Sequence, residues 1–367
     1  MSNFQVLSTD SSSSARCGLL NTPHGPVQTP VFMPVGTAGA VKGITPAQLK
    51  NTGTSIILAN TYHLMLRPGV QVIESLGGLH RFIGWNGPIL TDSGGYQLFS
   101  LSQLAQIKDA GVVFASHIDG ASTYLDAEMA TEIQHRLGAD IIMCLDQCPP
   151  YPSEPDKLHK AVQRTIAWAR RCKHAHKPTG PLLFAIVQGG TDPQLRAHCA
   201  QELVKLDFDG YAIGGLGLGE GHEQMIETVR RTAEFLPPQK PRYLMGLGTP
   251  ADIIAAVAAG IDMFDCVLPT RNGRNASAFT KAGPIRLRNN AYINDPEPVE
   301  PGCQCYCCRN FSRAAIRHFF NVGEMLGPIL LSIHNLTFYN RLISQISQKI
   351  QANSFAHWAE HQLKNQH

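Results

Sequence analysis

An aspartate inside an apolar stretch is the first residue of this sequence that suggests chemistry. Asp265 lies between Met263-Phe264 and Cys266-Val267-Leu268, and Arg271 and Arg274 follow it. Burying a carboxylate costs several kcal/mol unless the group is paired or used. Two interpretations follow: Asp265 pairs with one of the arginines and holds a turn, or it takes part in a reaction within a cleft.

Polar residues and glycines follow several other apolar runs. The segments are Thr91-Asp92-Ser93-Gly94-Gly95-Tyr96-Gln97, Asp146-Gln147-Cys148, Gln188-Gly189-Gly190, Gly214-Gly215-Leu216 and Met245-Gly246-Leu247-Gly248. Each of them alone is an ordinary turn sequence. Their recurrence after successive apolar runs favours one shared site in which carboxylates and amides converge.

Four cysteines crowd into six residues, at Cys303, Cys305, Cys307 and Cys308, and His334 follows a helical pattern that begins near Ser312. Three thiolates and an imidazole complete a tetrahedral Zn²⁺ site with no open position, which is a structural arrangement. A site made of all four cysteines competes with it, although the adjacent Cys307 and Cys308 would have difficulty reaching one ion. Free thiols are the remaining alternative.

Eight strand-like runs alternate with helical patterns and would position these residues. They are Pro30 to Val35, Ser55 to Asn60, Pro88 to Asp92, Asp140 to Asp146, Leu182 to Gln188, Gly210 to Leu216, Arg242 to Gly246 and Met263 to Leu268. Several are continuously apolar, as strands buried on both faces are. The pattern predicts an α/β fold, a (β/α)8 TIM barrel rather than an open sheet, with the polar segments at the carboxyl ends of its strands.

Two regions interrupt the repeat. Residues Val112 to Leu125 alternate around Asp119-Gly120, which predicts an inserted β-hairpin. Residues 284–334 contain the cysteine cluster and predict a zinc-binding subdomain near the C-terminus. We expect one catalytic barrel domain, residues 1–367, that includes this subdomain.

Composition excludes some classes of function. The chain has 367 residues, of which 43% are hydrophobic and 16% charged, so it can bury a large core. Its net charge of +3 is too small to make the whole surface a polyanion binder. A local cluster without any acid follows Asp265, and it consists of Arg271, Arg274, Lys281, Arg286 and Arg288. This cluster is either a surface for nucleic-acid phosphates or a solvated basic face.

The first twenty residues have no apolar core of signal-peptide length, and no apolar stretch is long enough to span a membrane. We therefore expect a cytoplasmic protein without a membrane partner. Its thiols would be reduced there, which favours metal binding by the crowded cysteines.

Taken together, these motifs resemble the bacterial tRNA-guanine transglycosylases, the queuine tRNA-ribosyltransferase family, over nearly the whole chain. The matching segments are Thr29-Pro30-Val31-Phe32-Met33-Pro34-Val35-Gly36-Thr37, Asn60-Thr61-Tyr62-His63-Leu64, Thr91-Asp92-Ser93-Gly94-Gly95, Gly214-Gly215-Leu216, Tyr243-Leu244-Met245-Gly246, Asp262-Met263-Phe264-Asp265-Cys266-Val267 and the Cys-x-Cys-x-x-Cys pattern. The resemblance implies a barrel enzyme of queuosine biosynthesis. Such an enzyme exchanges guanine at the wobble position (34) of GUN-anticodon tRNAs for 7-aminomethyl-7-deazaguanine (preQ1), through a covalent enzyme-RNA intermediate.

The resemblance also implies roles for individual residues. Asp265 would be the nucleophile and Asp92 the acid/base, which fits the two-carboxylate logic of retaining glycosyl transfer. The base would be bound by Asp92, Ser93, Gly94, Gly95, Tyr96, Asp146, Gln188, Gly215, Leu216 and Met245. The basic cluster would hold the tRNA anticodon loop. The zinc pattern implies Cys303, Cys305, Cys308 and His334 as ligands of one structural ion, with Cys307 spare.

Two other classes of function fit parts of this sequence. A non-catalytic, zinc-containing RNA-binding barrel would keep the basic cluster but would not need Asp92 and Asp265 together. A metal-dependent barrel hydrolase would need open-site ligands, whereas the predicted strand ends offer Asp, Gln and Gly without histidine pairs.

Three positions bear on details within the family pattern. Gln147 stands where many relatives have Glu, which puts the charge balance of the pocket in question. Leu218 is bulky where relatives that accept the large base queuine have a small residue, so a short pocket is expected. The resemblance also implies a homodimer, in which relatives have aromatic residues near the zinc region. This chain has Ala315 in place of one of these aromatic residues, so we expect its dimer to be weaker.

Overall fold

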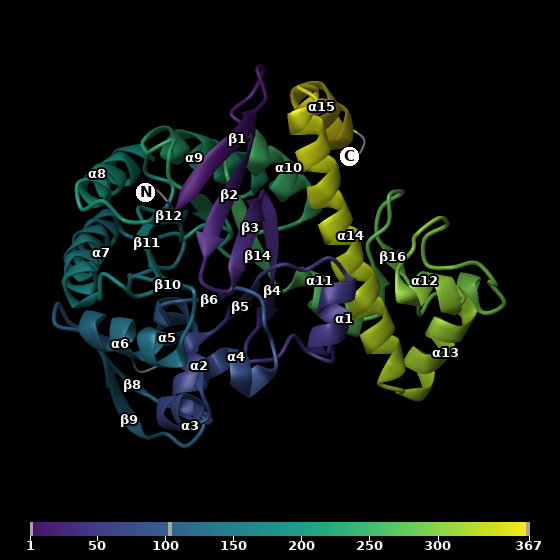
Figure 1. Cartoon of the computed structure of the whole chain (residues 1–367), viewed down its shortest axis with the longest axis horizontal. Coiled ribbons are helices and arrows are strands. Elements are labelled where there is room, and N and C mark those ends of the chain that lie inside the picture. Colours follow the sequence, from purple (N-terminus) through teal and green to yellow (C-terminus); the bar gives the residue numbers. More distant parts are fainter. Residues whose placement is uncertain (1–2, 102–104, 365–367) are drawn as a thin grey trace.

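The computed structural model describes residues 3–101 and 105–364, without the side chains of residues 99–101. Its centre is a closed barrel of eight parallel strands, which confirms the predicted (β/α)8 fold (Figure 1). All eight predicted runs contain a barrel strand. The strands are β4 (Val31–Gly36), β5 (Ile57–Ala59), β6 (Ile89–Thr91), β10 (Ile141–Met143), β11 (Leu182–Val187), β12 (Gly210–Ile213), β13 (Arg242–Leu244) and β14 (Met263–Cys266).

Burial on both faces explains why these strands read as continuous apolar runs. In β4, Val31, Met33 and Val35 pack with the inward residues of the other strands, while Phe32 packs outward. The ring of Phe32 lies 4.7 Å from that of Tyr339 on α14 (Leu326–Gln351). The barrel closes between β14 and β4, where Asp265 stands opposite Met33.

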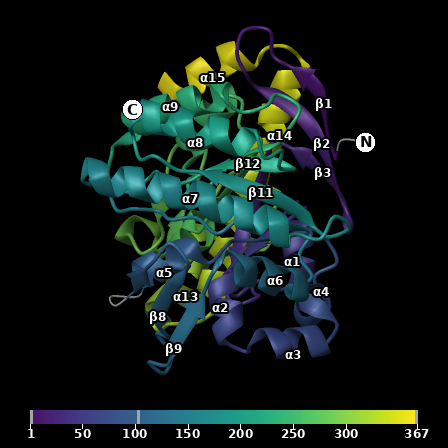
Figure 2. The ribbon, with the colours of Figure 1, turned by 90° about the vertical axis from the view of Figure 1, so that its left-hand side faces the viewer.

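Helices surround the barrel (Figures 1 and 2). They are α1 (Pro46–Asn51), α2 (Thr61–Leu66), α3 (Val70–Ser75), α4 (Gly78–Ile83), α5 (Gly95–Leu101), α6 (Ala127–Leu137), α7 (Pro155–Ala175), α8 (Pro193–Val204), α9 (His222–Glu234), α10 (Pro250–Ala258), α11 (Leu268–Arg274) and α15 (Phe355–Lys364). Several begin at side-chain N-caps, such as Asp192 before α8 and Thr249 before α10. None of the described helices is long and apolar enough to cross a membrane.

A three-stranded antiparallel sheet covers the amino-terminal end of the barrel and was not predicted. Its strands are β1 (Phe4–Thr9), β2 (Arg16–Thr22) and β3 (Gly25–Thr29). Phe4, Leu20 and Val27 join the inward residues of the barrel in one apolar cluster. Strand β2 does not alternate buried and exposed residues, so the sequence lacks the period of two that predicts a half-buried strand.

The buried Asp140 fastens this sheet to the barrel. One carboxylate oxygen accepts from the backbone N–H of His24 at 3.0 Å, and the other accepts from that of Ile89 at 2.8 Å. The imidazoles of His24 and His80 lie 2.8 and 3.0 Å from the same two oxygens. These contacts hold the carboxylate in its ionised form, because His80 and His24 keep the pKa of Asp140 below its usual value despite burial.

The predicted hairpin is confirmed as β8 (Val112–Ala115) and β9 (Ser122–Leu125), which pair in antiparallel register with Val112 opposite Leu125. Strand β7 (Gln106–Ile107) extends it to a three-stranded sheet. The insertion lies beside α2 and α3, away from β1 to β3 (Figure 2).

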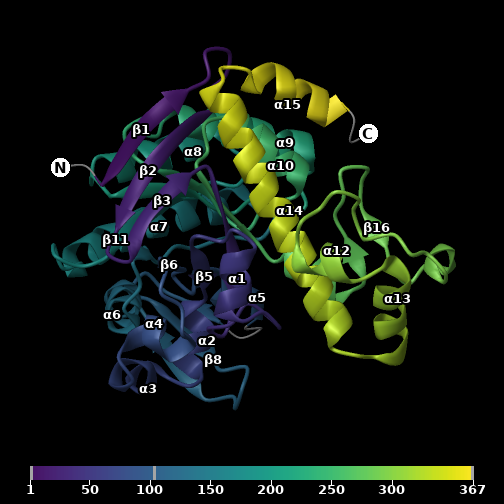
Figure 3. The same ribbon diagram turned by 45° about the vertical axis from the view of Figure 1, so that its right-hand side comes forward.

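The cysteine region is inserted between β14 and α14. It contains β15 (Ser277–Ala278), β16 (Ile285–Arg286), the 3₁₀ helix η1 (Asn290–Tyr292), α12 (Tyr306–Asn310) and α13 (Arg313–Val322), which Ser312 caps as expected. Its apolar residues, from Ala276 to Leu331, form a cluster separate from the barrel core. In Figure 3 this region projects from the barrel on the far side of α14.

Candidate functional site

A cavity of about 540 Å³ opens at the carboxyl end of the barrel strands. Its lining includes Asp92, Asp146 and Asp265, together with residues from the loops after β5, β6, β11, β12, β13 and β14. This is the end of the barrel at which polar residues were expected to converge. Three buried carboxylates in one cavity are expensive to desolvate, so each needs hydrogen-bond donors.

Asp92 follows β6 and is held by donors from three segments. One carboxylate oxygen accepts from the backbone N–H of Thr61 at 2.8 Å and of Gly94 at 3.2 Å. The other accepts from the amides of Asn60 and Gln97, the latter at 2.9 Å. Burial outweighs these donors and raises the pKa of Asp92 to about 6. A carboxyl group with such a pKa can release and take up a proton near neutral pH.

Asp265 is the last residue but one of β14 and is 8% exposed. It accepts hydrogen bonds from the hydroxyl of Tyr243 and from the backbone N–H of Gly246, both at 2.6 Å. No ion pair joins Asp265 to Arg271 or Arg274 within the described residues, so the turn-holding interpretation has no support in the geometry. Burial raises the pKa of Asp265, and the two donors oppose that rise.

Asp146 follows β10 and faces a set of groups suited to a planar ligand. Its carboxylate accepts from the Gln188 amide at 2.7 Å and from the Ser93 hydroxyl at 3.2 Å. Burial raises the pKa of Asp146 to about 6. The carbonyl oxygen of the Gln188 amide is buried without a protein partner among the described residues, so it is available to a ligand.

Glycines bring the backbone close to these groups. Gly215 has a φ of +69°, and a Cβ there would lie 2.2 Å from the Gln188 amide oxygen. A Cβ at Gly95 would lie 2.9 Å from the backbone oxygen of Asp146. Side chains at either position would fill space beside Gln188 and Asp146.

Tyr96 on α5 and Met245 after β13 both line the cavity, and Tyr96 is 53% exposed at its mouth. Leu216 and Leu218 line it from the loop after β12, with Cys148. The carboxylate of Glu220 holds this loop by accepting from the backbone N–H groups of Leu218 at 2.9 Å and Gly219 at 3.1 Å. The predicted residues Asp92, Ser93, Gly94, Tyr96, Asp146, Gln188, Gly215, Leu216 and Met245 therefore lie around one cavity with Asp265.

Sequence reasoning missed four residues that shape this site: Asn60, Gln97, Tyr243 and Glu220. Asn60 ends the second predicted run, so the rule that strand ends carry the site could have found it. Gln97 is the last residue of the selected segment Thr91 to Gln97, but it was given no role. Tyr243 sits inside an apolar run, where it is indistinguishable from a core residue.

Gln147 does not enter the cavity. Its side-chain oxygen accepts from Arg164 on α7 at 2.6 Å, and Arg164 also pairs with Asp109 at 2.7 Å. The difference between Gln and Glu at this position therefore acts on the contact with α7 rather than on the cavity.

The basic residues lie beside the cavity and on the inserted region. Arg271 on α11 is exposed and lines the cavity mouth. Arg274 is partly buried, and burial lowers its pKa. Lys281, Arg286 and Arg288 are exposed, and the guanidinium of Arg288 lies 5.8 Å from the ring centre of Phe320.

The cysteine region brings together the side chains predicted to bind metal. The sulfurs of Cys303, Cys305 and Cys308 lie 3.9, 3.6 and 3.3 Å from Nδ1 of His334, and all four atoms lie within 4.8 Å of one another. His334 Nε2 lies 2.8 Å from the backbone oxygen of Phe279, which directs the other nitrogen toward the sulfurs. The donor set and its burial fit a closed tetrahedral metal site.

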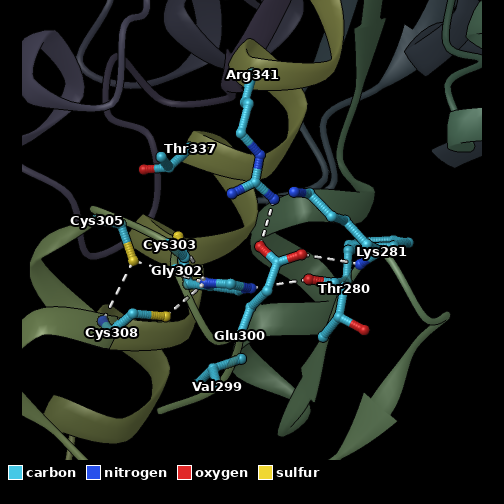
Figure 4. Close-up of polar contacts among 12 residues, drawn as sticks. Thr280, Lys281, Val299, Glu300, Gly302, Cys303, Cys305, Cys308, Thr337 and Arg341 are labelled. Atoms are coloured by element: carbon cyan, nitrogen blue, oxygen red, sulfur yellow. Dashed lines mark hydrogen bonds and ion pairs between the residues drawn. The ribbon is translucent and has the colours of Figure 1, made fainter.

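A polar pair flanks this cluster (Figure 4). Glu300 accepts from the backbone N–H of Lys281 at 2.9 Å and pairs with Arg341 on α14.

Cys307 is fully buried but lies outside the four-atom group.

A second cavity, of about 590 Å³, lies outside the barrel between α8 and α9. Its charged lining residues Glu227, Arg230 and Arg231 pair with one another. These side chains neutralise one another in ion pairs, so they are not free to bind a charged ligand. The barrel cavity, with its three buried carboxylates, is therefore the candidate active site.

Comparison with known proteins agrees with this geometry. A family model described as queuine tRNA-ribosyltransferase matches residues 10–367. Queuine tRNA-ribosyltransferases from Natranaerobius thermophilus and Caldanaerobacter subterraneus are each 50% identical to this chain, over 99% and 98% of it and 98% and 96% of their own lengths. The one from Pelotomaculum thermopropionicum is 52% identical over 94% of this chain and 93% of its own length. The chain belongs to the queuine tRNA-ribosyltransferase family, as the resemblance predicted.

The geometry of the candidate metal site predicts different roles for the adjacent residues Cys307 and Cys308. Cys308→Ser should lose bound metal and several kcal/mol of unfolding free energy, because structural metal binding is coupled to folding. Cys307→Ser is the matched control and should keep the metal. Elemental analysis and urea unfolding measure both. Loss of metal from Cys307→Ser with retention in Cys308→Ser would show that the ligand register is wrong.

Proposed function

We propose that this member of the queuine tRNA-ribosyltransferase family exchanges guanine at the wobble position of GUN-anticodon tRNAs for 7-aminomethyl-7-deazaguanine. The observation that carries the proposal is the convergence of Asp92, Asp146 and Asp265 on one cavity. Two of these acids suit glycosyl transfer, and the third suits recognition of a base with N–H donors.

The exchange takes place in two displacements at the anomeric carbon. The Asp265 carboxylate attacks C1′ of the ribose, and the electron pair of the C1′–N9 bond goes to guanine, which takes a proton from the Asp92 carboxyl group. The incoming base then gives its N9 proton to Asp92, and its N9 attacks C1′ as the ester to Asp265 breaks. Both acids return to their starting states, and the two inversions give net retention.

The base is held in its plane by complementary partners. Asp146 accepts from the N1–H and the exocyclic amine, while Gln188 and the backbone N–H of Gly215 contact the carbonyl edge. The contact between Gln188 and Asp146, at 2.7 Å, gives way when the base enters. The Leu216 carbonyl accepts from the aminomethyl group, and Tyr96 and Met245 enclose the ring on its two faces.

A cavity of about 540 Å³ holds a nucleoside but no stacked loop, so the wobble nucleotide must leave its stack to enter. The exposed Arg271, Lys281, Arg286 and Arg288 then contact phosphates of the anticodon loop, and Arg274 supports them from a partly buried position. A cytoplasmic location, where tRNA is modified, stays a prediction.

Zn²⁺ is the ion that best suits three thiolates and one imidazole, and it would act structurally. Cys303, Cys305, Cys308 and His334 would hold it. We propose that residues 284–334 act as a zinc-binding subdomain of a single catalytic domain, where the metal keeps the basic surface in place beside the cavity.

The inserted region also supports the proposed homodimer. Several of its apolar side chains are exposed: Ile293 (51%), Tyr306 (53%), Val322 (56%), Met325 (74%) and Leu326 (37%). Apolar side chains gathered on one projecting region are typical of interfaces between subunits. Ala315 lies in this region on α13, where a larger side chain would add contact area.

The nucleophile is tested by Asp265→Asn, which keeps the shape of the side chain but removes its reactivity. This variant should form no trapped protein–RNA adduct and lose exchange by orders of magnitude. Intact-protein mass spectrometry after incubation with tRNA measures the adduct. Wild-type levels of adduct and exchange in the variant would exclude Asp265 as nucleophile, and absence of adduct from the wild-type protein would favour a non-catalytic RNA-binding barrel.

The raised pKa of Asp146 predicts pH-dependent base binding. The ionised carboxylate accepts hydrogen bonds, so guanine affinity should be full above the pKa of about 6 and fall about tenfold for each pH unit below it. Calorimetry in an Asp92→Asn background isolates Asp146, because Asp92 has a similar pKa. Equal affinity at about pH 5 and about pH 8 would contradict the assigned role.

Leu218 predicts which base is accepted. It lines the cavity with Cys148, so the cyclopentenediol of queuine would overpack the pocket at a cost of about 1–3 kcal/mol. Exchange with queuine should therefore be less efficient than with 7-aminomethyl-7-deazaguanine, and Leu218→Gly should narrow the difference. Comparable kcat/KM for the two bases in the unmodified chain would contradict the short pocket.

The dimer is tested by dilution. A missing aromatic anchor can weaken association by about 2 kcal/mol, so the chain should dissociate at higher concentration than Ala315→Tyr. Analytical ultracentrifugation of both forms measures the difference. A chain that stays monomeric at every concentration and retains full exchange activity would remove the dimer from the mechanism.

A further inference from the structure

We propose that Tyr243 is a positioning residue that presents Oδ2 of Asp265, rather than Oδ1, to the anomeric carbon. The inference rests on the proposed function, because it concerns the way in which the nucleophile of that reaction is aimed. Tyr243 acts through Asp265 and carries no step of the reaction itself.

Two donors act on the same oxygen of Asp265. The Tyr243 hydroxyl and the Gly246 backbone N–H each lie 2.6 Å from Oδ1. Oδ2 receives no hydrogen bond from any residue that the structure describes. The two carboxylate oxygens are therefore unequal before any substrate binds.

The donors come from a rigid part of the barrel. Tyr243 lies in β13, is fully buried, and packs among the inward residues of the barrel. Strand β13 pairs with β14 in parallel register, with Leu244 opposite Phe264, the residue before Asp265. Gly246 follows the same strand, so both donors approach Asp265 from one side and fix the rotation of its carboxylate.

This arrangement suits both displacements. Attack requires an oxygen with a free lone pair, which Oδ2 has. When the ester forms through Oδ2, Oδ1 becomes its carbonyl oxygen and keeps both donors. When the ester breaks, negative charge returns to Asp265, and donors already in place stabilise it without reorganisation. The Tyr243 hydroxyl remains a donor throughout, since burial and the neighbouring Asp265 raise its pKa far above the usual value.

Tyr243→Phe removes the hydroxyl and leaves the ring in place. Tyr211→Phe is the matched control, because Tyr211 is also fully buried in a barrel strand and its hydroxyl accepts a hydrogen bond, from Phe208 N–H at 3.2 Å. We expect kcat to fall about tenfold or more in Tyr243→Phe, with KM for tRNA and base within about twofold of wild type. Tyr211→Phe should keep the wild-type kcat.

The pH profile separates positioning from a structural role. Loss of a donor to the ionised carboxylate raises its pKa, so the acidic limb of kcat should move to higher pH in Tyr243→Phe and stay in place in Tyr211→Phe. A Tyr243→Phe enzyme with wild-type kcat and an unmoved acidic limb would overturn the proposal.

A crystal structure of the trapped wild-type adduct tests the oxygen assignment directly, even if Tyr243→Phe fails to fold. We expect C1′ bonded to Oδ2, with Tyr243 and Gly246 still donating to Oδ1. A bond to Oδ1 would overturn the proposal and leave the proposed function intact. A failure of the function looks different, since the wild-type protein would then form no adduct at all.

Discussion

Desolvation of carboxylates is the constraint on which this site depends. Asp92, Asp146 and Asp265 are all buried in one cavity, and each remains usable only because donors from neighbouring strand ends surround it. A closed parallel barrel supplies such donors, because it brings the carboxyl ends of all eight strands to one rim. In each acid, burial raises the pKa and hydrogen-bond donors lower it. Burial raises the pKa of Asp92 and Asp146 to about 6, so both are close to titration at neutral pH.

Helix α14 connects the segment after β14, the strand that contains Asp265, to the group formed by His334 and three cysteines. It carries His334 among the sulfurs, and one residue later Asn335 donates to the backbone oxygens of Pro269 at 2.9 Å and Ser277 at 3.0 Å. Pro269 belongs to α11, which follows the Asp265 strand directly. Further along, Tyr339 packs against Phe32 on β4, the strand that pairs with β14. The group of cysteines around His334, the basic surface and the segment after Asp265 are thus held by one helix.

The barrel could be predicted from sequence because a strand buried on both faces has a distinctive apolar run, and the acids could be predicted because they follow such runs. The partners of these acids could not. Asn60 donates to Asp92 across 32 positions of the chain and Tyr243 to Asp265 across 22, and these pairings depend on which strands become neighbours. The amino-terminal sheet was missed because its strand β2 does not alternate buried and exposed residues, so the period of two that predicts a half-buried strand is lost. Gln147 was assigned to the pocket by its position after Asp146, yet its side chain turns outward to Arg164.

The sheet that covers the amino-terminal end of the barrel makes the cavity blind. The barrel interior is filled by apolar residues such as Met33, Leu90 and Phe184, and Phe4, Leu20 and Val27 of the amino-terminal sheet belong to the same apolar cluster. In the proposed reaction, a base can therefore enter or leave only through the mouth at which the RNA would bind. If one set of partners around Asp146 serves both bases, as proposed, the first base must depart before the second arrives, while the RNA stays attached to the enzyme. The blind cavity and the proposed covalent intermediate together predict ping-pong kinetics, in which each base competes with the other for one form of the enzyme.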